Sequence, residues 1–483
     1  MKEVSIKSNK ELNIWEALIP LVILIIMLAF NVFVFGDDSL SGSNQFILLL
    51  GGAVAAIVGF YNKVSYKEMI NEVANNFKSV TGAILILLLV GSLAGTWMIS
   101  GIIPSMIYYG LLILKPAIFL PATMIICAII SIATGSSWTT SATVGIALVG
   151  IGKALGIPLG MVAGAVISGA YFGDKMSPLS DTTNLAAAMA GSELFSHIRY
   201  MSMTTVPSIT IALVIFSIIS LTQNPTGQTE TSDILLAIDQ AFNINPLLFI
   251  VPAAVIFMIV KKTKPLIALL FGSLLGGIFA VIFQPSIVAN AGGGENLNLI
   301  TAYRGVMNAL TTDVSINTSS ASLNDLFSSG GMAGMLNTIW LVLCAMVFGG
   351  VMEAIGALTR ISQTLLSIGK SVFGLFASTV ASCLTLNVTA SDQYLALVVS
   401  GKMFQKAYKD RNLAPENLSR TLEDSGTVTS VLVPWNTCGA YQSSVLGVPV
   451  MDYFVYAIFN YLSPFMTLIF AAFMIKIKKL DKE

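Results

Sequence analysis

Two hydroxyl-rich stretches, Ala133–Ser137 and Val388–Asp392, interrupt sequence that is otherwise apolar enough to cross a membrane. The first follows the apolar run Ala117–Ile132 and the second follows Val372–Leu386. Corresponding residues of the two stretches are 255 positions apart (389 − 134 for the threonines). Polar side chains at membrane depth are costly unless they line a cavity or bind a ligand. The oxygen-bearing residues that these stretches offer to a cation are Thr134, Ser136, Ser137, Thr389, Ser391 and Asp392.

A second pair of polar segments, Gly173–Asn184 and Glu423–Thr437, contains one proline each, Pro178 and Pro434. Proline removes an amide and frees a carbonyl one turn earlier, so a helix broken there exposes carbonyls from one half and amides from the other. Carbonyl, hydroxyl and carboxylate oxygens suit a hard cation such as sodium, and exposed helix N-termini suit a carboxylate-bearing solute. The further candidate binding residues in these segments are Asp181, Thr182, Asn184, Asn436 and Thr437.

Asp181 is the leading candidate for both sodium ligand and proton carrier, and Asp392 is the corresponding acid of the second stretch. A carboxylate cannot hold sodium and a proton together, and this competition alone gives coupled exchange. Plain sodium/proton exchange needs only acids and neutral oxygens. An organic anion would need added donors, for which Lys175, Asn184, Asn436 and the broken-helix amides are candidates. The sequence does not choose between the two.

Several acids are candidates for proton coupling, and each has a structural alternative. Asp174 and Lys175 can form a structural ion pair or lie at the cytoplasmic rim, and Glu423 with Asp424 can mark a helix start at the membrane surface. Glu353 lies within a small-residue span, so it can carry protons or hydrogen-bond to moving helices. The full set of proton-coupling candidates is Asp174, Asp181, Glu353, Asp392, Glu423 and Asp424.

Composition decides which elements must position these residues. The chain is 55% hydrophobic and 10% charged, whereas a soluble domain has about 25% charged residues. Apolar runs near the roughly 20 residues that a helix needs to span a bilayer recur along the chain. These features predict an all-α polytopic membrane protein of roughly 10–12 spans with broken helices. The formal net charge of zero argues against nucleic acid as a partner and leaves membrane lipid as the surroundings.

The apolar segments pair up along the chain, which predicts two repeats, residues 1–222 and 233–483, joined by an external polar linker at 223–232. Basic residues favour the cytoplasmic side, and they place both termini inside. By the same rule Gly82–Ile99 runs from inside to outside, whereas its mate Met335–Met352 runs from outside to inside. The halves are therefore expected to have inverted topology, with a two-fold axis in the membrane plane.

Four of these stretches together resemble the NhaC family of sodium/proton antiporters: Ala133–Gly145, Ser168–Asn184, Thr389–Tyr394 and Leu422–Tyr441. The resemblance implies a prokaryotic plasma membrane and ion-coupled exchange, and the family also includes a malate/lactate antiporter and members that move amino acids. The wider ion transporter superfamily implies a scaffold, a mobile part with two re-entrant hairpins, frequent homodimers and elevator-type motion.

The predicted function is thus secondary sodium/proton antiport, with coupled transport of a small organic anion or amino acid as the alternative. A channel is the second class, but two inverted polar breaks favour alternating access over a selectivity filter. An intramembrane enzyme is the third class, and no HExxH motif supports it. We therefore expect no enzymatic activity and no cofactor besides the transported sodium. The sole histidine, His197, stands beside Arg199 and is expected at the inner surface rather than as a pH sensor.

Overall fold

The computed structural model describes the chain except residues 1–11, 36–38, 40–41, 223–227, 317–326 and 481–483. Part of the predicted linker at 223–232 and the first lysines therefore lie outside the described residues. Within them, eight helices are long and apolar enough to span a membrane, or up to nine if one bent pair counts as a span. The prediction of an all-α polytopic membrane protein is confirmed.

The first part of the chain is helical from Ile14 to Thr222 with short interruptions. Its helices are α1 (Ile14–Phe35), α2 (Ser43–Tyr61), α3 (Tyr66–Ile99), α4 (Ile102–Ile113), α5 (Pro116–Thr134), α6 (Ser137–Thr140), α7 (Ile146–Ala154), α8 (Leu159–Met176), α9 (Asp181–Ala190) and α10 (Leu194–Thr222), with a π-helical turn at Ser141–Gly145 between α6 and α7.

The second part carries the two short strands and a comparable series of helices. These are α11 (Gln228–Ala241), α12 (Ile250–Val260), α13 (Pro265–Phe283), α14 (Pro285–Ala291), α15 (Leu299–Thr311), β1 (Val314–Ser315), β2 (Ser328–Ser329), α17 (Leu336–Ala354), α18 (Ala357–Ile368), α19 (Val372–Thr389), α20 (Gln393–Asp410), α21 (Pro415–Leu422), α22 (Thr437–Leu446), α23 (Val450–Phe454) and α24 (Ile458–Ala472). A π-helical turn at Glu423–Thr427 continues α21, and short 3-10 turns lie at Pro246–Phe249, Ala333–Met335 and Ser430–Leu432.

Local signals explain several helix starts. Ser65 caps α3 in a capping box with Glu68, and such reciprocal bonds satisfy two otherwise free amides. Proline opens α5 and α13, where its missing amide costs no helical bond. Gly101 precedes α4 with φ 79° and Gly356 precedes α18 with φ 77°, so the same left-handed bend recurs 255 residues apart (356 − 101).

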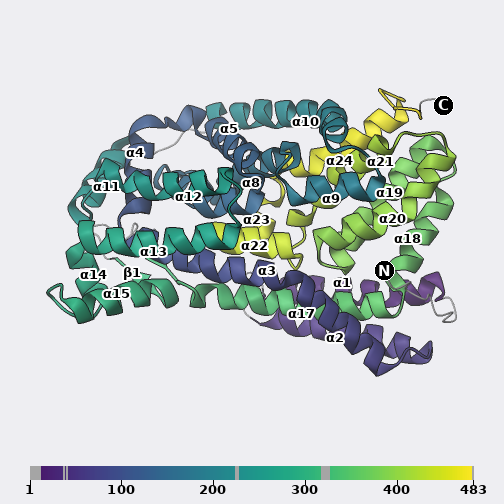
Figure 1. Ribbon diagram of the computed structural model, residues 1–483, viewed down its shortest axis with the longest axis horizontal. Coiled ribbons are helices and arrows are strands. Elements are labelled where there is room, and N and C mark those ends of the chain that lie inside the picture. Colours follow the sequence, from purple (N-terminus) through teal and green to yellow (C-terminus); the bar gives the residue numbers. More distant parts are fainter. Residues whose placement is uncertain (1–11, 36–38, 40–41, 223–227, 317–326, 481–483) are drawn as a thin grey trace.

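Helices from the two parts of the chain pack against each other. α2 lies against α17, and α3 lies against α13. In Figure 1, α11, α14, α15 and strand β1 gather at the left end, whereas α18 and α21 lie toward the right with the C-terminal end. The first half of the site depends on close packing of α5 against α8. A Cβ at Gly169 would lie 2.1 Å from the Met124 carbonyl oxygen, and one at Gly173 would lie 2.5 Å from that of Ala128. This approach brings the end of α8 beside the end of α5.

Candidate functional site

The first break separates α5 from α6. Gly135 follows α5 with φ 69°, a left-handed conformation that favours glycine. A Cβ there would also lie 2.6 Å from the Cβ of Leu179, in the loop between α8 and α9. Ser136 then caps α6, with its hydroxyl oxygen accepting from the Thr139 amide at 3.1 Å. The first break is therefore fixed both by its own turn and by contact with the second polar loop of the same half.

The second break separates α19 from α20 in a different way. Ser391 occupies the left-handed region with φ 58° although it is not glycine. Asp392 caps α20, and its Oδ1 accepts from the amides of Tyr394 at 2.8 Å and Leu395 at 3.0 Å. The Ser391 carbonyl in turn accepts from the Thr437 amide at 3.0 Å, at the start of α22. As in the first break, the helix tip touches the second polar loop of its own half.

A carboxylate also faces the helix start at the first break, but it comes from another helix. Asp174, near the end of α8, accepts through Oδ2 from the Ser137 amide at 3.0 Å and the Ser137 hydroxyl at 2.7 Å. Negative charge near a helix N-terminus is stabilised by the free amides and the helix dipole. Asp174 and Asp392 thus each accept from backbone amides at a helix start, and they differ in which helix supplies the acid.

The breaks surround one cavity of about 720 Å³. Its wall combines one face of α3, the break between α5 and α6, the loop between α8 and α9, the loop between α12 and α13, and the starts of α20 and α22. The polar residues that line it are Ser79, Thr134, Ser136, Asp174, Ser180, Asp181, Thr182, Lys262, Thr263, Lys264, Asp392, Gln393, Tyr394 and Thr437. Three carboxylates and several hydroxyls therefore face a single space.

Seven of the residues predicted from the sequence line this cavity. Asp181, at the start of α9, is exposed to it, whereas Asp392 is 4% exposed. Those that the cavity brings together are Thr134, Ser136, Asp174, Asp181, Thr182, Asp392 and Thr437. Among the described residues no group of three or more His, Cys, Asp or Glu side chains is arranged to hold a metal ion. A sodium ion here would depend on hydroxyl and carbonyl oxygens as well as acids.

Other predicted residues do not line the cavity but support its wall. Asn184 donates to the carbonyls of Pro178 and Ser180. Asn436 caps α22 by accepting from the Cys438 amide, and it donates to the Asn387 carbonyl. The remaining three are Ser137, Thr389 and Ser391, and the Thr389 hydroxyl donates to the Thr385 carbonyl. These contacts favour a positioning role over direct contact with an ion.

The alternative in which Asp174 and Lys175 form a structural ion pair is wrong. Lys175 forms an ion pair with Asp424, 249 residues away, and both side chains are fully buried. Asp424 also accepts from the hydroxyls of Thr204 and Thr467. Adjacent residues of a helix point in different directions, so Asp174 faces the cavity while Lys175 faces the π-helical turn that follows α21. Lys175 is neutralised and absent from the cavity wall, and it is not a free donor for a solute.

The alternative that placed Glu423 and Asp424 at a helix start on the membrane surface is also wrong. The helix begins at Pro415, and both acids are fully buried in the π-helical turn that continues it. Glu353 is partly buried in α17 and lies outside the cavity wall. The carboxylate of Glu72 in α3 interacts electrostatically with Glu353.

His197 is fully buried, which contradicts its expected place at the inner surface. It lies on the inward face of α10 with Tyr200, Met201 and Thr204, whereas Arg199 is exposed on the other face. Neither ring nitrogen has a hydrogen-bond partner in the described part of the chain. The neighbouring charges are those of Lys175, Asp424 and Glu416. The prediction was wrong because residues two positions apart in a helix point to different faces, so an exposed Arg199 does not imply an exposed His197.

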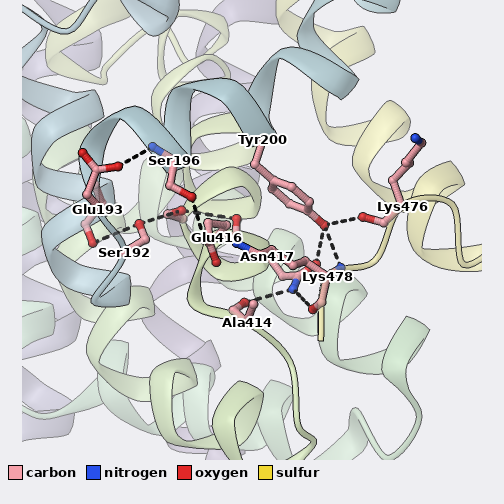
Figure 2. Close-up of polar contacts among 11 residues, drawn as sticks. Ser192, Glu193, Ser196, Tyr200, Ala414, Glu416, Asn417, Lys476 and Lys478 are labelled. Carbon is pink, nitrogen blue, oxygen red and sulfur yellow. Dashed lines mark hydrogen bonds and ion pairs between the residues drawn. The ribbon is translucent and has the colours of Figure 1, made fainter. Parts of the chain in front are cut away.

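The start of α21 is held by the chain's C-terminal segment, as Figure 2 shows. Lys478 pairs with Glu416 at 2.6 Å, and the Ser196 hydroxyl donates to the same carboxylate at 2.7 Å. The Tyr200 hydroxyl lies 2.6 Å from Asn417 Oδ1 and 2.7 Å from the Lys476 carbonyl oxygen. Burial alone would raise the pKa of Glu416, but the bonds from Lys478 and Ser196 outweigh it and hold that pKa below its ordinary value. We call this set the C-terminal clamp.

Sequence reasoning missed several residues of the site. Trp138 lines the cavity and stacks on Tyr441 with ring centroids 3.9 Å apart, and the Tyr441 hydroxyl donates to the Trp138 carbonyl. This stack joins α6 to α22 across the two halves. Lys262 and Lys264 stand in the loop between α12 and α13 at the cavity wall. From the sequence, these lysines predict only the orientation of the chain in the membrane. Nothing in their spacing connects them with residues of the breaks.

Several known proteins to which this chain is similar are named as antiporters. The Na+/H+ antiporter family matches residues 169–475 of this chain. The Na(+)/H(+) antiporter NhaC of Alkalihalophilus pseudofirmus is 38% identical over 417 residues, 86% of this chain and 87% of that protein. The Malate-2H(+)/Na(+)-lactate antiporter of Bacillus subtilis is 35% identical, and the arginine/ornithine antiporter ArcD of Halobacterium salinarum is 33% identical. Each of these two alignments covers 95% of this chain and 92% of the relative.

Proposed function

Since the chain belongs to the Na+/H+ antiporter family, we propose that it is a multi-pass membrane transporter that exchanges sodium for protons through the cavity described above. The observation that carries this proposal is the meeting of acids and hydroxyls from both breaks at one space of about 720 Å³. The relatives named as antiporters support the same activity. Transport, rather than chemical conversion of a substrate, is the function that this arrangement suits.

Asp181 is the proposed sodium ligand, because its carboxylate is exposed in the cavity. Asp392 is the second ligand, and its Oδ1 is already held by two amides of α20. The amides keep that carboxylate in one orientation, since a cap bond fixes the side chain. The proposed neutral ligands are the cavity-lining hydroxyls of Thr134, Ser136, Thr182 and Thr437.

Two inverted repeats, residues 1–222 and 233–483, would provide alternating access around this site. The recurrence of left-handed bends at Gly101 and Gly356 supports this. The contacts of α2 with α17 and of α3 with α13, each between the two proposed repeats, support it as well. Lys262 and Lys264 at the cavity wall fit an opening toward the cytoplasm by the positive-inside rule. We propose an elevator-type motion in a prokaryotic plasma membrane, with cytoplasmic termini and a homodimeric assembly.

Coupled transport of a small organic anion or amino acid is the second candidate. A cavity of about 720 Å³ is far larger than a sodium ion needs and is typical of small-molecule sites. Lys262 and Lys264 supply positive charge at its wall, and the start of α9 opens into it. The names of the malate/lactate and arginine/ornithine relatives support the same candidate.

A proteoliposome flux experiment tests both candidates. Vesicles loaded with sodium are given an imposed pH gradient, and internal pH is followed with a dye. Sodium-dependent proton movement without added solute supports plain antiport. A requirement for malate, lactate or an amino acid supports the second candidate, and the absence of sodium-dependent proton movement under every condition overturns both.

A further inference from the structure

Two adjacent acids in one π-helical turn have opposite surroundings. Asp424 is bonded by Lys175, Thr204 and Thr467. Neither carboxylate oxygen of Glu423 has a partner at hydrogen-bonding geometry among the described residues, and the Thr427 hydroxyl is the polar group that approaches it. Both acids are fully buried. The difference identifies Glu423 as the buried acid without a compensating partner.

The charged groups around Glu423 come from a few elements. Asp174 and Lys175 act on it from α8, and Asp424 acts on it from the same turn. The turn packs against α9, α19, α20, α21 and α24, and Cys383 is the titratable neighbour from α19. On α21, one turn earlier, lies the guanidinium of Arg420. It is enclosed by aromatic rings, at 4.7 Å from Tyr200, 5.9 Å from Phe376 and 5.7 Å from Phe470.

These surroundings favour a neutral Glu423 in this conformation. Lys175 and Asp424 already compensate one another, so an ionised Glu423 would add an unpaired buried charge. Burial of an unpaired charge is costly, whereas the protonated acid avoids that cost. The backbone geometry is consistent with a working site, because π-helical turns occur frequently at functional sites.

Asp174 connects Glu423 with the cavity. Its carboxylate lines the cavity wall, and the next residue of α8, Lys175, is bonded to Asp424 beside Glu423. Asp174 is thus the acid of the cavity wall to which a proton leaving Glu423 would pass on its way to cavity water. The carboxylate left behind lies within the influence of Lys175, whose charge it then shares with Asp424. Each release moves one proton from Glu423 to the cavity and leaves one negative charge on Glu423.

We propose that Glu423 carries the transported proton at a site separate from the sodium ligand Asp181, with Asp174 as the intermediate between them. This inference rests on the proposed sodium/proton exchange. It differs from exchange by competition at a single carboxylate, because sodium and proton would be held at different residues and coupled through charge.

The test separates sodium movement from proton coupling in proteoliposomes. Sodium counterflow without a pH gradient and sodium accumulation driven by a pH gradient are measured for wild type, Glu423→Gln, Glu416→Gln and Asp181→Asn. We expect Glu423→Gln to keep counterflow within about 2-fold of wild type and to lose pH-driven accumulation at least about 10-fold, which corresponds to roughly 1.4 kcal/mol of coupling. Glu416→Gln, at the start of α21 and outside the cavity wall, should keep both activities. Asp181→Asn should lose both.

The outcomes are distinguishable. Wild-type pH-driven accumulation by Glu423→Gln would overturn the inference and leave the proposed function intact, and so would loss of both activities by a folded Glu423→Gln protein. A wild-type protein without sodium/proton exchange would overturn the proposed function instead. If Glu423→Gln does not fold, infrared difference spectra of the wild type provide the test. Sodium addition should remove a protonated carboxyl band that Glu423→Asp shifts, and the absence of that band, or its persistence unshifted in Glu423→Asp, would also overturn the inference.

Discussion

The two breaks that line the cavity reach a similar arrangement with different residues. The first uses Gly135 for its left-handed turn and borrows the carboxylate of Asp174 from α8. The second places Ser391 in the left-handed region and supplies its own acid, Asp392, as the cap of α20. Both end with a carboxylate held by the amides of a helix start.

The difference reflects the space available for a side chain at each left-handed turn. Gly135 has no space for a side chain, because Leu179 lies against it. Ser391 has a side chain, and its backbone conformation is disfavoured for residues other than glycine, which typically costs about 1–3 kcal/mol. We infer that sterics fix the first turn and that the bond from the Thr437 amide to the Ser391 carbonyl helps to hold the second.

The largest effect should come from Asp181, the acid exposed in the cavity beside the first break. Asp181→Asn removes the carboxylate charge, and we expect sodium-driven proton movement to fall about 100-fold, as loss of a charged contact of about 2–3 kcal/mol implies. Folding should persist, because the Asp181 side chain is exposed. If the correctly folded variant exchanges sodium for protons at the wild-type rate, Asp181 is not the sodium ligand.

A stability difference between the turns should come next. Gly135→Ala should lower the free energy of unfolding by about 2–4 kcal/mol, from the left-handed backbone and the contact with Leu179. Ser391→Gly at the matching turn should change it by less than about 1 kcal/mol, because relief of strain opposes the greater freedom of the unfolded chain. Thermal unfolding in detergent measures both. Equal losses in the two variants would contradict the proposed division between sterics and hydrogen bonding.

Asp392→Asn tests whether the second acid binds sodium or only caps α20. Asparagine is as good a cap as aspartate, so the helix start should survive. The half-saturating sodium concentration should rise about 10-fold, equivalent to roughly 1.4 kcal/mol. Ser137→Ala at the first break, which removes one of the two bonds to Asp174, is the matched variant and should change it less. An unchanged sodium dependence in Asp392→Asn would leave Asp392 with a purely structural role.

The smallest effect concerns the C-terminal clamp, which holds α21 of the second half. The pKa of Glu416 is lowered in the folded protein, so its stabilisation is present above the ordinary value of about 4.3 and is lost as pH falls through the folded value. Lys478→Ala should cost about 0.5 kcal/mol at pH 7, since Lys478 is 43% exposed. The difference in melting temperature from wild type should shrink below about pH 4. A difference that grows with acidity would contradict the assignment.

Much of the site was predictable because polar interruptions of apolar helices are visible in sequence. The matched positions of Thr134 and Thr389 located both breaks, and Asp181 and Asp392 both line the cavity. The pairing of Lys175 with Asp424 was not predictable, because it depends on packing between residues 249 positions apart. The burial of His197 was not predictable for a similar reason, since the charged groups near it come from other elements. Helix spacing gives a face, and only packing decides what covers it.

The stacking of Trp138 on Tyr441 provides an optical probe at the junction of the two halves. The chain has five tryptophans, and replacing the other four by phenylalanine would leave a single tryptophan, at the cavity wall, that can be excited selectively. Its emission would respond to hydration of the cavity and to separation of the rings as the halves move. Stopped-flow mixing with sodium could then follow the transport cycle in real time without any attached dye.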